Sequence, residues 1–335
     1  MSYATRQASG VAGIITPWNL PMYLLTFKIA PALAAGNTVV AKPSEITSAT
    51  AWMLCKVFEE AELPAGVVNM VFGSGAKAGE AIVKHPGIRM ISFTGSGPVG
   101  ARITEASSHF WKKVSLELGG KNAGIVFDDV NMDACVEGLI RGSFTNQGEI
   151  CLCTSRIFVQ TGIFHSFLEK FVKATRNIKV GDPKDPNTKM GPLVSIGHLA
   201  KVKSYVAAAK ADGATIQCGE GVDPLELPPG NEGYYMRPTV ITNIADTHQC
   251  MQDEIFGPVT CIVPFEAEEE ASGVDVLMSA ALRGMTSIIT GKDLNQRLNA
   301  AYRLHPITVV AADFYSNSAK DIQELSDYWR QPEKT

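Results

Sequence analysis

The 335-residue sequence has no apolar run long enough to cross a bilayer, and its first seven residues lack the apolar core of a signal peptide. It also lacks a basic excess, since 30 Lys and Arg stand against 34 Asp and Glu, a net charge of −4. A chain without a positive field attracts nucleic acid and anionic lipid weakly. We therefore expect a cytoplasmic protein whose partner is a small molecule, with no role for nucleic acid or a membrane.

Disulfide and metal-binding patterns are missing as well. The seven cysteines are odd in number and scattered, which indicates a reducing compartment. Cys151 and Cys153 have neither C-x-x-C spacing nor a nearby His, so no metal site is predicted. The six histidines form no cluster, and we assign none of them a catalytic role.

The length suffices for two domains. Up to residue 119, short apolar runs alternate with helical stretches, a pattern typical of a doubly wound α/β domain with a parallel sheet. The predicted strands are 11–15, 38–41, 67–71, 90–93 and 113–118, and the predicted helices are 23–35, 47–61, 76–84 and 98–107. Ligands bind such sheets outside the carboxyl ends of the strands, so the residues after each run are the candidates for a site.

Glycines follow the fourth of these strands in the order G-x-G-x-x-G, from Gly95 to Gly100. After a strand and before a helix, this spacing lets backbone N–H groups approach a pyrophosphate. An ordinary tight turn remains an alternative explanation. The usual rule, an acidic residue about twenty positions further on, selects Glu117 as a ribose ligand.

After residue 119 the pattern continues as a second α/β domain. We predict strands at 123–127, 156–160 and 234–241, helices at 132–146, 164–176 and 195–212, and a surface loop at 219–233. The helix at 132–146 leads into the segment from Asn146 to Arg156, where Cys151 and Cys153 lie in a stretch with few charges behind a glycine. A thiol displayed after a glycine turn suits nucleophilic catalysis, although free cysteines more often pack as small apolar residues.

Six motifs together resemble the aldehyde dehydrogenase superfamily in order and spacing. They are Trp18-Asn19, Lys42-Pro43-Ser44-Glu45, Phe93-Thr94-Gly95-Ser96, Leu116-Glu117-Leu118-Gly119-Gly120-Lys121, the Cys151 stretch and Glu254-Ile255-Phe256-Gly257-Pro258. The amino-acid sequence around Cys151 looks most like that of the 2-aminomuconic semialdehyde dehydrogenase branch. The resemblance implies NAD-dependent oxidation of an aldehyde, such as a semialdehyde, to a carboxylic acid.

The resemblance also implies the catalytic roles. Cys151, and not Cys153, matches the nucleophile that forms a hemithioacetal and then a thioester. The side-chain amide of Asn19 and the backbone N–H of Cys151 would hold the oxyanion. Glu117 matches the general base that activates the hydrolytic water, and this placement replaces the ribose role that the glycine rule suggests.

The cofactor that the resemblance implies is NAD. Lys42 and Glu45 match the pair that reaches the adenosine ribose, where a carboxylate repels the 2′-phosphate of NADP. Ser96 would contact the pyrophosphate, Glu254 the nicotinamide ribose, and Phe256 would pack near the nicotinamide. The remaining expected cofactor contacts are Thr16, Trp18, Ser44, Gly95, Gly100 and Leu118.

Three features depart from the family pattern. The family rarely has glycine at the position of Gly97, so the turn that would hold the pyrophosphate is expected to be looser here. The chain begins just before a family strand, so residues 1–119 are expected to form an incomplete NAD-binding domain, followed by a catalytic domain at 120–313. Residues 314–335 are expected to form a divergent tail, after a turn at His305-Pro306 and a strand at 307–312.

These departures leave a second function open. The family forms homo-oligomers, and the segments that build them are expected to be missing or altered here. An exposed sheet edge invites pairing with other chains. We therefore expect low activity and aggregation or a non-native oligomer. The alternative to an active dehydrogenase is a truncated, catalytically weak relative that only binds a nucleotide or a partner.

Overall fold

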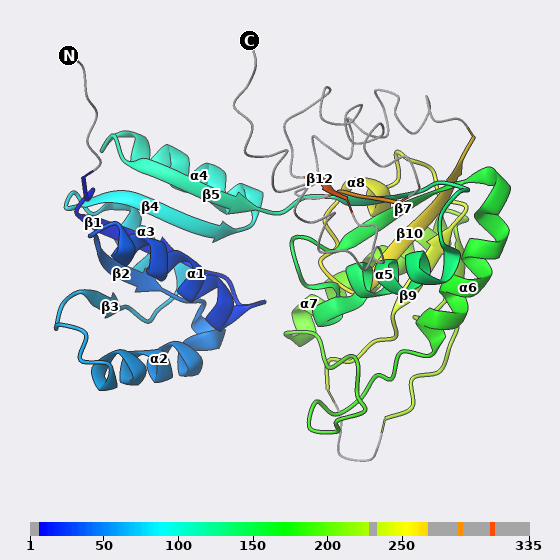
Figure 1. Ribbon diagram of the computed structural model, residues 1–335, viewed down its shortest axis with the longest axis horizontal. Coiled ribbons are helices and arrows are strands. Elements are labelled where there is room, and N and C mark those ends of the chain that lie inside the picture. The colour runs from blue at the N-terminus through cyan, green and yellow to red at the C-terminus, as the bar shows by residue number, and fades with distance from the viewer. Residues whose placement is uncertain (1–6, 228–232, 267–286, 291–308, 312–335) are drawn as a thin grey trace, which may run out of the picture. The chain divides into compact units, whose positions relative to one another are not determined.

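The computed structural model describes residues 7–227, 233–266, 287–290 and 309–311. The chain divides into two compact units, Met1–Gly119 and Gly120–Thr335. The first unit is drawn in blue to cyan and the second in green to red in Figure 1. The expected divergent tail and the expected turn at His305-Pro306 lie outside the described residues.

The first unit is a five-stranded parallel sheet with the strand order β3-β2-β1-β4-β5. Its strands are β1 (Val11–Ile15), β2 (Thr38–Lys42), β3 (Val68–Met70), β4 (Ile88–Gly95) and β5 (Lys113–Leu118). Its helices are α1 (Pro21–Ala34), α2 (Ser48–Glu60), α3 (Glu80–Lys84) and α4 (Gly97–Ser108), with a 3₁₀ turn at Glu45–Thr47 and a π-helical turn at Gly75–Gly79. The predicted α/β class with a doubly wound parallel sheet is confirmed.

Helices cover both faces of this sheet because successive side chains of a strand point to opposite faces. Along β1, Ile14 packs into a core with Leu25 of α1 and residues of α2, whereas the next residue, Ile15, packs with Ile82 and Ile103 of α3 and α4. Full burial of such a side chain contributes about 1.5–3 kcal/mol. Continuous apolar runs, buried on both faces, therefore specify this layer structure.

The strand order reverses beside β1, because β2 and β3 lie on one side of it and β4 and β5 on the other. In open parallel sheets this switch point is where ligands bind, outside the carboxyl ends of the strands. Thr16 follows β1 and Ser96 follows β4, so the topology places two of the predicted cofactor contacts at the ends of neighbouring strands.

The second unit is a seven-stranded sheet with the order β12-β11-β6-β7-β10-β9-β8, in which only the β8–β9 pair is antiparallel among the described strands. The strands are β6 (Asn122–Val126), β7 (Thr154–Gln160), β8 (Thr215–Cys218), β9 (Thr239–Thr242), β10 (Val259–Phe265), β11 (Ser287–Thr290) and β12 (Val309–Ala311). The helices are α5 (Met132–Phe144), α6 (Phe164–Arg176), α7 (Ile196–Ala211) and α8 (Gln249–Gln252), with 3₁₀ turns at Thr145–Gly148 and Thr161–Ile163.

Both faces of the second sheet are again buried. On β7, Ile157 and Val159 pack with α5 and α6, whereas Phe158 between them packs with α7. The sequence-based prediction missed β10, because Val259–Phe265 is buried at every position except Pro264 and shows no alternation. It also missed β8 and extended the helix at 132–146 two residues too far. No helix in the part of the chain described is long and apolar enough to span a membrane.

Candidate active site

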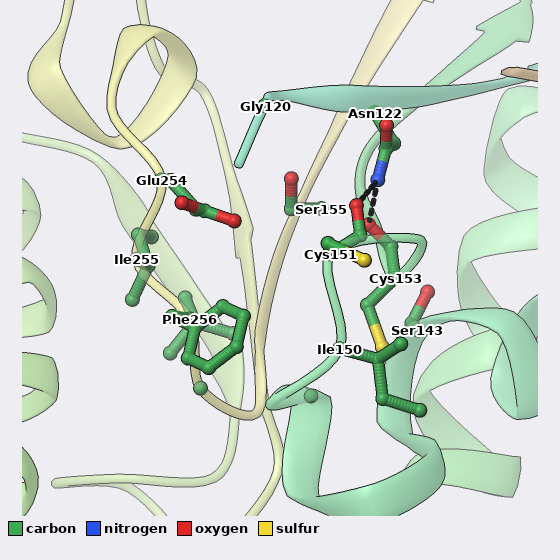
Figure 2. Close-up of a pocket in the computed structure, with 13 residues that line it drawn as sticks. Gly120, Asn122, Ser143, Ile150, Cys151, Cys153, Ser155, Glu254, Ile255 and Phe256 are labelled. Atoms are coloured by element: carbon green, nitrogen blue, oxygen red, sulfur yellow. Dashed lines mark hydrogen bonds between the residues drawn. The ribbon is translucent and has the colours of Figure 1, made fainter. Parts of the chain in front are cut away.

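A pocket in the second unit lies where the neighbouring strands β6, β7 and β10 begin (Figure 2). It is lined by Gly120, Asn122, Ser143, Gly148, Ile150, Cys151, Cys153, Ser155, Glu254, Ile255, Phe256, Gly257 and Val259. Three segments that are distant in sequence therefore supply its walls. The position at the amino ends of the strands was not anticipated, since the usual rule directs attention to carboxyl ends.

The turn before Cys151 has an unusual backbone. Asn146, Gln147 and Gly148 adopt positive φ angles of 51°, 58° and 70° in succession. This conformation ends the preceding helix, and it costs about 1–3 kcal/mol at each residue other than glycine. Backbone hydrogen bonds from Glu149 to Asn146 (2.9 Å) and from Cys153 to Ile150 (2.9 Å) hold the turn. Strain of this kind is characteristic of functional sites.

Asn122, the first residue of β6, fixes the segment that carries the two cysteines. Its side-chain Nδ2 donates to the backbone oxygens of Cys151 (2.5 Å) and Cys153 (3.1 Å). One amide thus ties the cysteine segment to the neighbouring strand, 29 residues earlier in the sequence. Sequence reasoning missed this role, although an Asn that directly follows the Gly-Gly-Lys motif was a visible signal.

The two cysteines differ in their surroundings. The Cys153 thiol donates to the backbone oxygen of Thr145 (3.6 Å), and burial raises its pKa to about 12. Such a thiol stays protonated and is a poor nucleophile. Both cysteines are half-buried and line the pocket, and Figure 2 shows Cys151 across the pocket from the loop that carries Glu254 and Phe256. These surroundings favour Cys151 over Cys153 as the nucleophile.

The opposite wall of the pocket is formed by Glu254 and Phe256 (Figure 2). Burial raises the pKa of the Glu254 carboxyl, and a backbone hydrogen bond from Gly120 opposes that shift. Phe256 adopts a positive φ of 59°. Its backbone oxygen accepts a hydrogen bond from Nε2 of His198 (2.6 Å), and the two rings lie edge to face. The structure thus brings Cys151, Glu254 and Phe256 to one pocket.

Glu149 and His198 were not selected from the sequence. Glu149 is 3% exposed, and its Oε1 accepts from the backbone N–H of Val194 (3.2 Å) and lies 3.5 Å from Nε2 of His198. Burial raises the pKa of Glu149 to about 7 and lowers that of His198. A charged residue type inside an otherwise uncharged segment was the available signal for Glu149, whereas the His198 contacts depend on the fold.

The raised pKa of Glu149 predicts a pH-dependent effect of Glu149→Gln. Because ionisation is less favourable in the folded state than in the unfolded state, this carboxyl destabilises the fold progressively as pH rises from about 4.5 to 7 and fully above that. Gln keeps the acceptor for Val194 without a charge. We expect the variant to gain about 1–3 kcal/mol in free energy of unfolding at pH 8 and less than about 1 kcal/mol at pH 5. Urea denaturation at both pH values measures this, and an equal gain at both would contradict it.

The other predicted catalytic residues belong to the first unit. Asn19 lies between β1 and α1 and is buried. Glu117 is half-buried on β5, opposite Thr94 of β4. It acts electrostatically on Lys28, a buried lysine whose pKa is lowered by burial and whose Nζ donates to Ser92 (3.0 Å). A lysine beside Glu117 supplies a charge that sequence reasoning did not anticipate.

Lys42, the last residue of β2, forms an ion pair of 3.4 Å with Glu45. The Lys42 side chain is 3% exposed, and its Nζ also donates to the backbone oxygens of Pro43 (2.8 Å) and Gly73 (3.1 Å). The Glu45 side chain is 56% exposed. The buried ammonium therefore orients a carboxylate that remains open to a ligand, with Ser44 buried between them.

The predicted glycine turn joins β4 to α4, in the strand-before-helix arrangement that a pyrophosphate site needs. Ser96 is the N-cap residue of α4, and its side chain makes no capping hydrogen bond. A Cβ on Gly100 would lie 2.7 Å from Leu118 Cδ2, so this glycine permits close packing of α4 on β5. A Cβ on Gly97 would meet nothing within 4 Å, so packing does not require glycine there.

The remaining predicted cofactor contacts lie at the carboxyl end of β1. Thr16 is buried, and its backbone N–H donates to the backbone oxygen of Lys42 (3.1 Å), which ties the ends of β1 and β2 together. Trp18 is half-buried in the same connection. The uncapped N-terminus of α4 and the exposed carboxylate of Glu45 fit the phosphate and ribose groups of a dinucleotide, so the residues of this unit suit such a cofactor.

Comparisons with known proteins agree with these features. A profile of the aldehyde dehydrogenase family matches residues 1–322. The chain is 62% identical over 271 residues to 2-aminomuconic semialdehyde dehydrogenase of Homo sapiens, covering 81% of this chain and 56% of that protein. It is 56% identical over 305 residues to the Mus musculus protein of the same name, covering 91% of this chain and 62% of that protein. The chain thus spans about six tenths of the length of these relatives.

Solved structures of aldehyde dehydrogenases also resemble the chain. Betaine aldehyde dehydrogenase from Staphylococcus aureus, determined in complex with NAD+, matches with a TM-score of 0.84 and 35% identity, over 91% of this chain and 59% of that one. An aldehyde dehydrogenase from Burkholderia cenocepacia, described as putative, matches with a TM-score of 0.86 and 41% identity, over 93% of this chain and 63% of that one.

Proposed function

The chain belongs to the aldehyde dehydrogenase family, and on that premise we propose that it carries the catalytic and cofactor-binding residues for NAD-dependent oxidation of an aldehyde to a carboxylic acid. The observation that carries this proposal is the pocket that Cys151 lines together with Glu254 and Phe256, beside a second thiol kept protonated by burial. Covalent catalysis on a carbonyl requires an accessible nucleophile, which this thiol supplies.

For each chemical step, we assign the role to a residue of this chain. The Cys151 thiolate attacks the aldehyde carbon to form a hemithioacetal, and the Asn19 amide and the Cys151 N–H stabilise the developing oxyanion. Loss of hydride from the hemithioacetal leaves a thioester on Cys151. Glu117 accepts a proton from water, which attacks the thioester and releases the carboxylic acid.

NAD, when bound, supplies the hydride acceptor. Lys42 and Glu45 would hold its adenosine ribose, with Ser44 and Thr16 beside them, and the turn from Gly95 to Gly100 with Ser96 would hold its pyrophosphate. Glu254 would bind the nicotinamide ribose, and Phe256 would pack against the nicotinamide. Trp18 and Leu118 complete the set of proposed cofactor contacts.

The proposed substrate is a semialdehyde of the 2-aminomuconic type. The identity of 62% to a protein named for that substrate supports this choice over betaine aldehyde, whose named dehydrogenase from Beta vulgaris is 42% identical over 295 residues. Assays of NADH formation with 2-aminomuconic semialdehyde, betaine aldehyde and simple aliphatic aldehydes test both proposals. Absence of NADH with every aldehyde would reject the activity, and faster turnover of betaine aldehyde would reject the substrate.

Glu45 predicts a preference for NAD over NADP. A carboxylate at this position accepts from the 2′-hydroxyl and repels a 2′-phosphate. We expect Glu45→Ser to reduce the ratio of NAD affinity to NADP affinity about tenfold, which corresponds to about 1.4 kcal/mol. Calorimetric titration with each cofactor measures the ratio. Glu59→Ser, which removes another exposed glutamate paired with a lysine three residues away, is the control. Tighter binding of NADP by the unmodified protein would reject the preference.

We also propose a cytoplasmic location, and in place of the regular homo-oligomer of the family we expect aggregation or a non-native oligomer. The seven cysteines are odd in number and scattered, which suits a reducing compartment. Size-exclusion chromatography with light scattering tests the oligomeric state, and a monodisperse tetramer with robust turnover would reject this expectation.

A further inference from the structure

Three segments that are distant in sequence meet behind the pocket. Glu149 lies two residues before Cys151, His198 lies in the first turn of α7, and Phe256 lies in the loop before β10. Oε1 of Glu149 is 3.5 Å from Nε2 of His198, and the same nitrogen is 2.6 Å from the backbone oxygen of Phe256. The imidazole therefore lies between the turn at residues 146–151, called the nucleophile turn below, and the loop at residues 254–258, called the Phe256 loop.

The same two walls also touch through their backbones. A Cβ on Gly148 would lie 2.3 Å from the backbone oxygen of Gly257, so no side chain separates the two segments at this point. A second hydrogen bond, from the backbone N–H of Val194 to Glu149 (3.2 Å), attaches the segment that precedes α7 to the nucleophile turn. Any movement of the Phe256 loop is therefore resisted at two points, the glycine contact and the His198 hydrogen bond.

Phe256 needs such support because its backbone is strained. A phenylalanine with a φ of 59° occupies a region that L-residues other than glycine rarely adopt, and this conformation persists only when surrounding contacts hold it. His198 makes a contact to this residue that is both short and directional, together with an edge-to-face ring contact at a centroid distance of 6.2 Å. The ring is 13% exposed, so water competes weakly for the hydrogen bond.

We propose that His198 is a positioning residue, which donates from Nε2 to the Phe256 carbonyl and, with Glu149 as its neighbour on the nucleophile turn, sets the separation between Phe256 and Cys151. The donor role requires a proton on Nε2. Burial lowers the pKa of the imidazole, so the ring acts as a neutral donor near pH 7. The significance for catalysis rests on the proposed function, in which Phe256 packs against the nicotinamide.

The first measurement needs neither cofactor nor turnover. In His198→Leu, which keeps the bulk of the side chain without the donor, we expect faster backbone hydrogen exchange in the peptide that contains Phe256 and Gly257. His198→Gln places an amide N–H near the position of Nε2 and should restore protection, whereas the shorter His198→Asn should not. Mass spectrometry after exchange of the full chain follows the three variants peptide by peptide.

The second measurement connects the loop to the cofactor. His198→Leu should weaken NAD binding about five- to tenfold in calorimetric titration, the loss expected for one buried hydrogen bond. The KM for the aldehyde should change less than about twofold, because Phe256 is placed against the cofactor. His165→Leu, the same substitution at an exposed histidine of α6, is the matched control and should change neither quantity.

The possible results separate cleanly. Faster exchange confined to the Phe256 peptide and the nucleophile turn, with recovery in His198→Gln, supports the positioning role. Unchanged exchange overturns this role, because it shows that His198 does not hold the Phe256 loop in place. An equal increase in exchange throughout the second unit also overturns it, because it shows only a general loss of stability. If the unmodified protein binds no NAD, the proposed function fails, but the exchange experiment still tests the role of His198.

Discussion

Replacing Cys151 with Ala is expected to lower the rate of NADH formation by about 10⁴-fold or more, since removal of a covalent nucleophile eliminates the reaction path and not one contact within it. The thiol lines the pocket opposite Phe256, and Asn122 holds its backbone oxygen. Initial rates with the preferred aldehyde measure the loss. Fragmentation mass spectrometry of the unmodified protein, quenched during turnover, should locate the acyl group on Cys151.

Cys153→Ser is the matched control for this prediction. Burial raises the pKa of the Cys153 thiol to about 12, and its Sγ donates to the backbone oxygen of Thr145, a role that a hydroxyl can also fill. We expect activity within about threefold of the parent, because one neutral hydrogen bond contributes about 1 kcal/mol or less to stability. An acyl group found on Cys153, or full activity in Cys151→Ala, would contradict the assignment of the nucleophile.

Gly148→Ala is expected to have the largest effect on stability, at least about 3 kcal/mol in free energy of unfolding. Two costs add at this position. The φ of +70° disfavours any residue with a Cβ by about 1 kcal/mol, and the new atom would lie 2.3 Å from the Gly257 oxygen. Because the opposing atom belongs to the backbone, relief requires movement of the whole Phe256 loop, and the activity should fall with it.

The comparison variant for Gly148→Ala is Gly197→Ala. Gly197 lies in the first turn of α7, where a Cβ would meet nothing within 4 Å and φ is not in the left-handed region. Alanine has the higher helix propensity, so we expect a gain of up to about 1 kcal/mol. Urea denaturation followed by circular dichroism measures both variants. Equal effects of the same sign at the two glycines would show that the contact with Gly257 is not restrictive.

Much of the fold was predictable from local patterns. The strands of the first unit are short apolar runs bounded by glycine and proline, and their continuous burial follows from helices on both faces. The sequence missed β10, since a run that is buried at nearly every position has no periodicity with which to distinguish a strand from a buried helix. It placed the end of the α5 helix two residues late, because the positive φ angles of Asn146 and Gln147 leave little trace in residue type.

The sequence by itself determined the doubly wound architecture of the first unit, the family, and the residues that carry the proposed chemistry, because these depend on residue type, periodicity and motif order along the chain. Tertiary structure alone decided how Cys151 is held. Asn122, Glu149 and His198 act through partners 29, 45 and 58 residues away, respectively. Such contacts depend on which strands become neighbours, and no local pattern encodes that pairing. The hydrogen bonds that hold the nucleophile turn and the contact that supports Phe256 are therefore visible only in the folded chain.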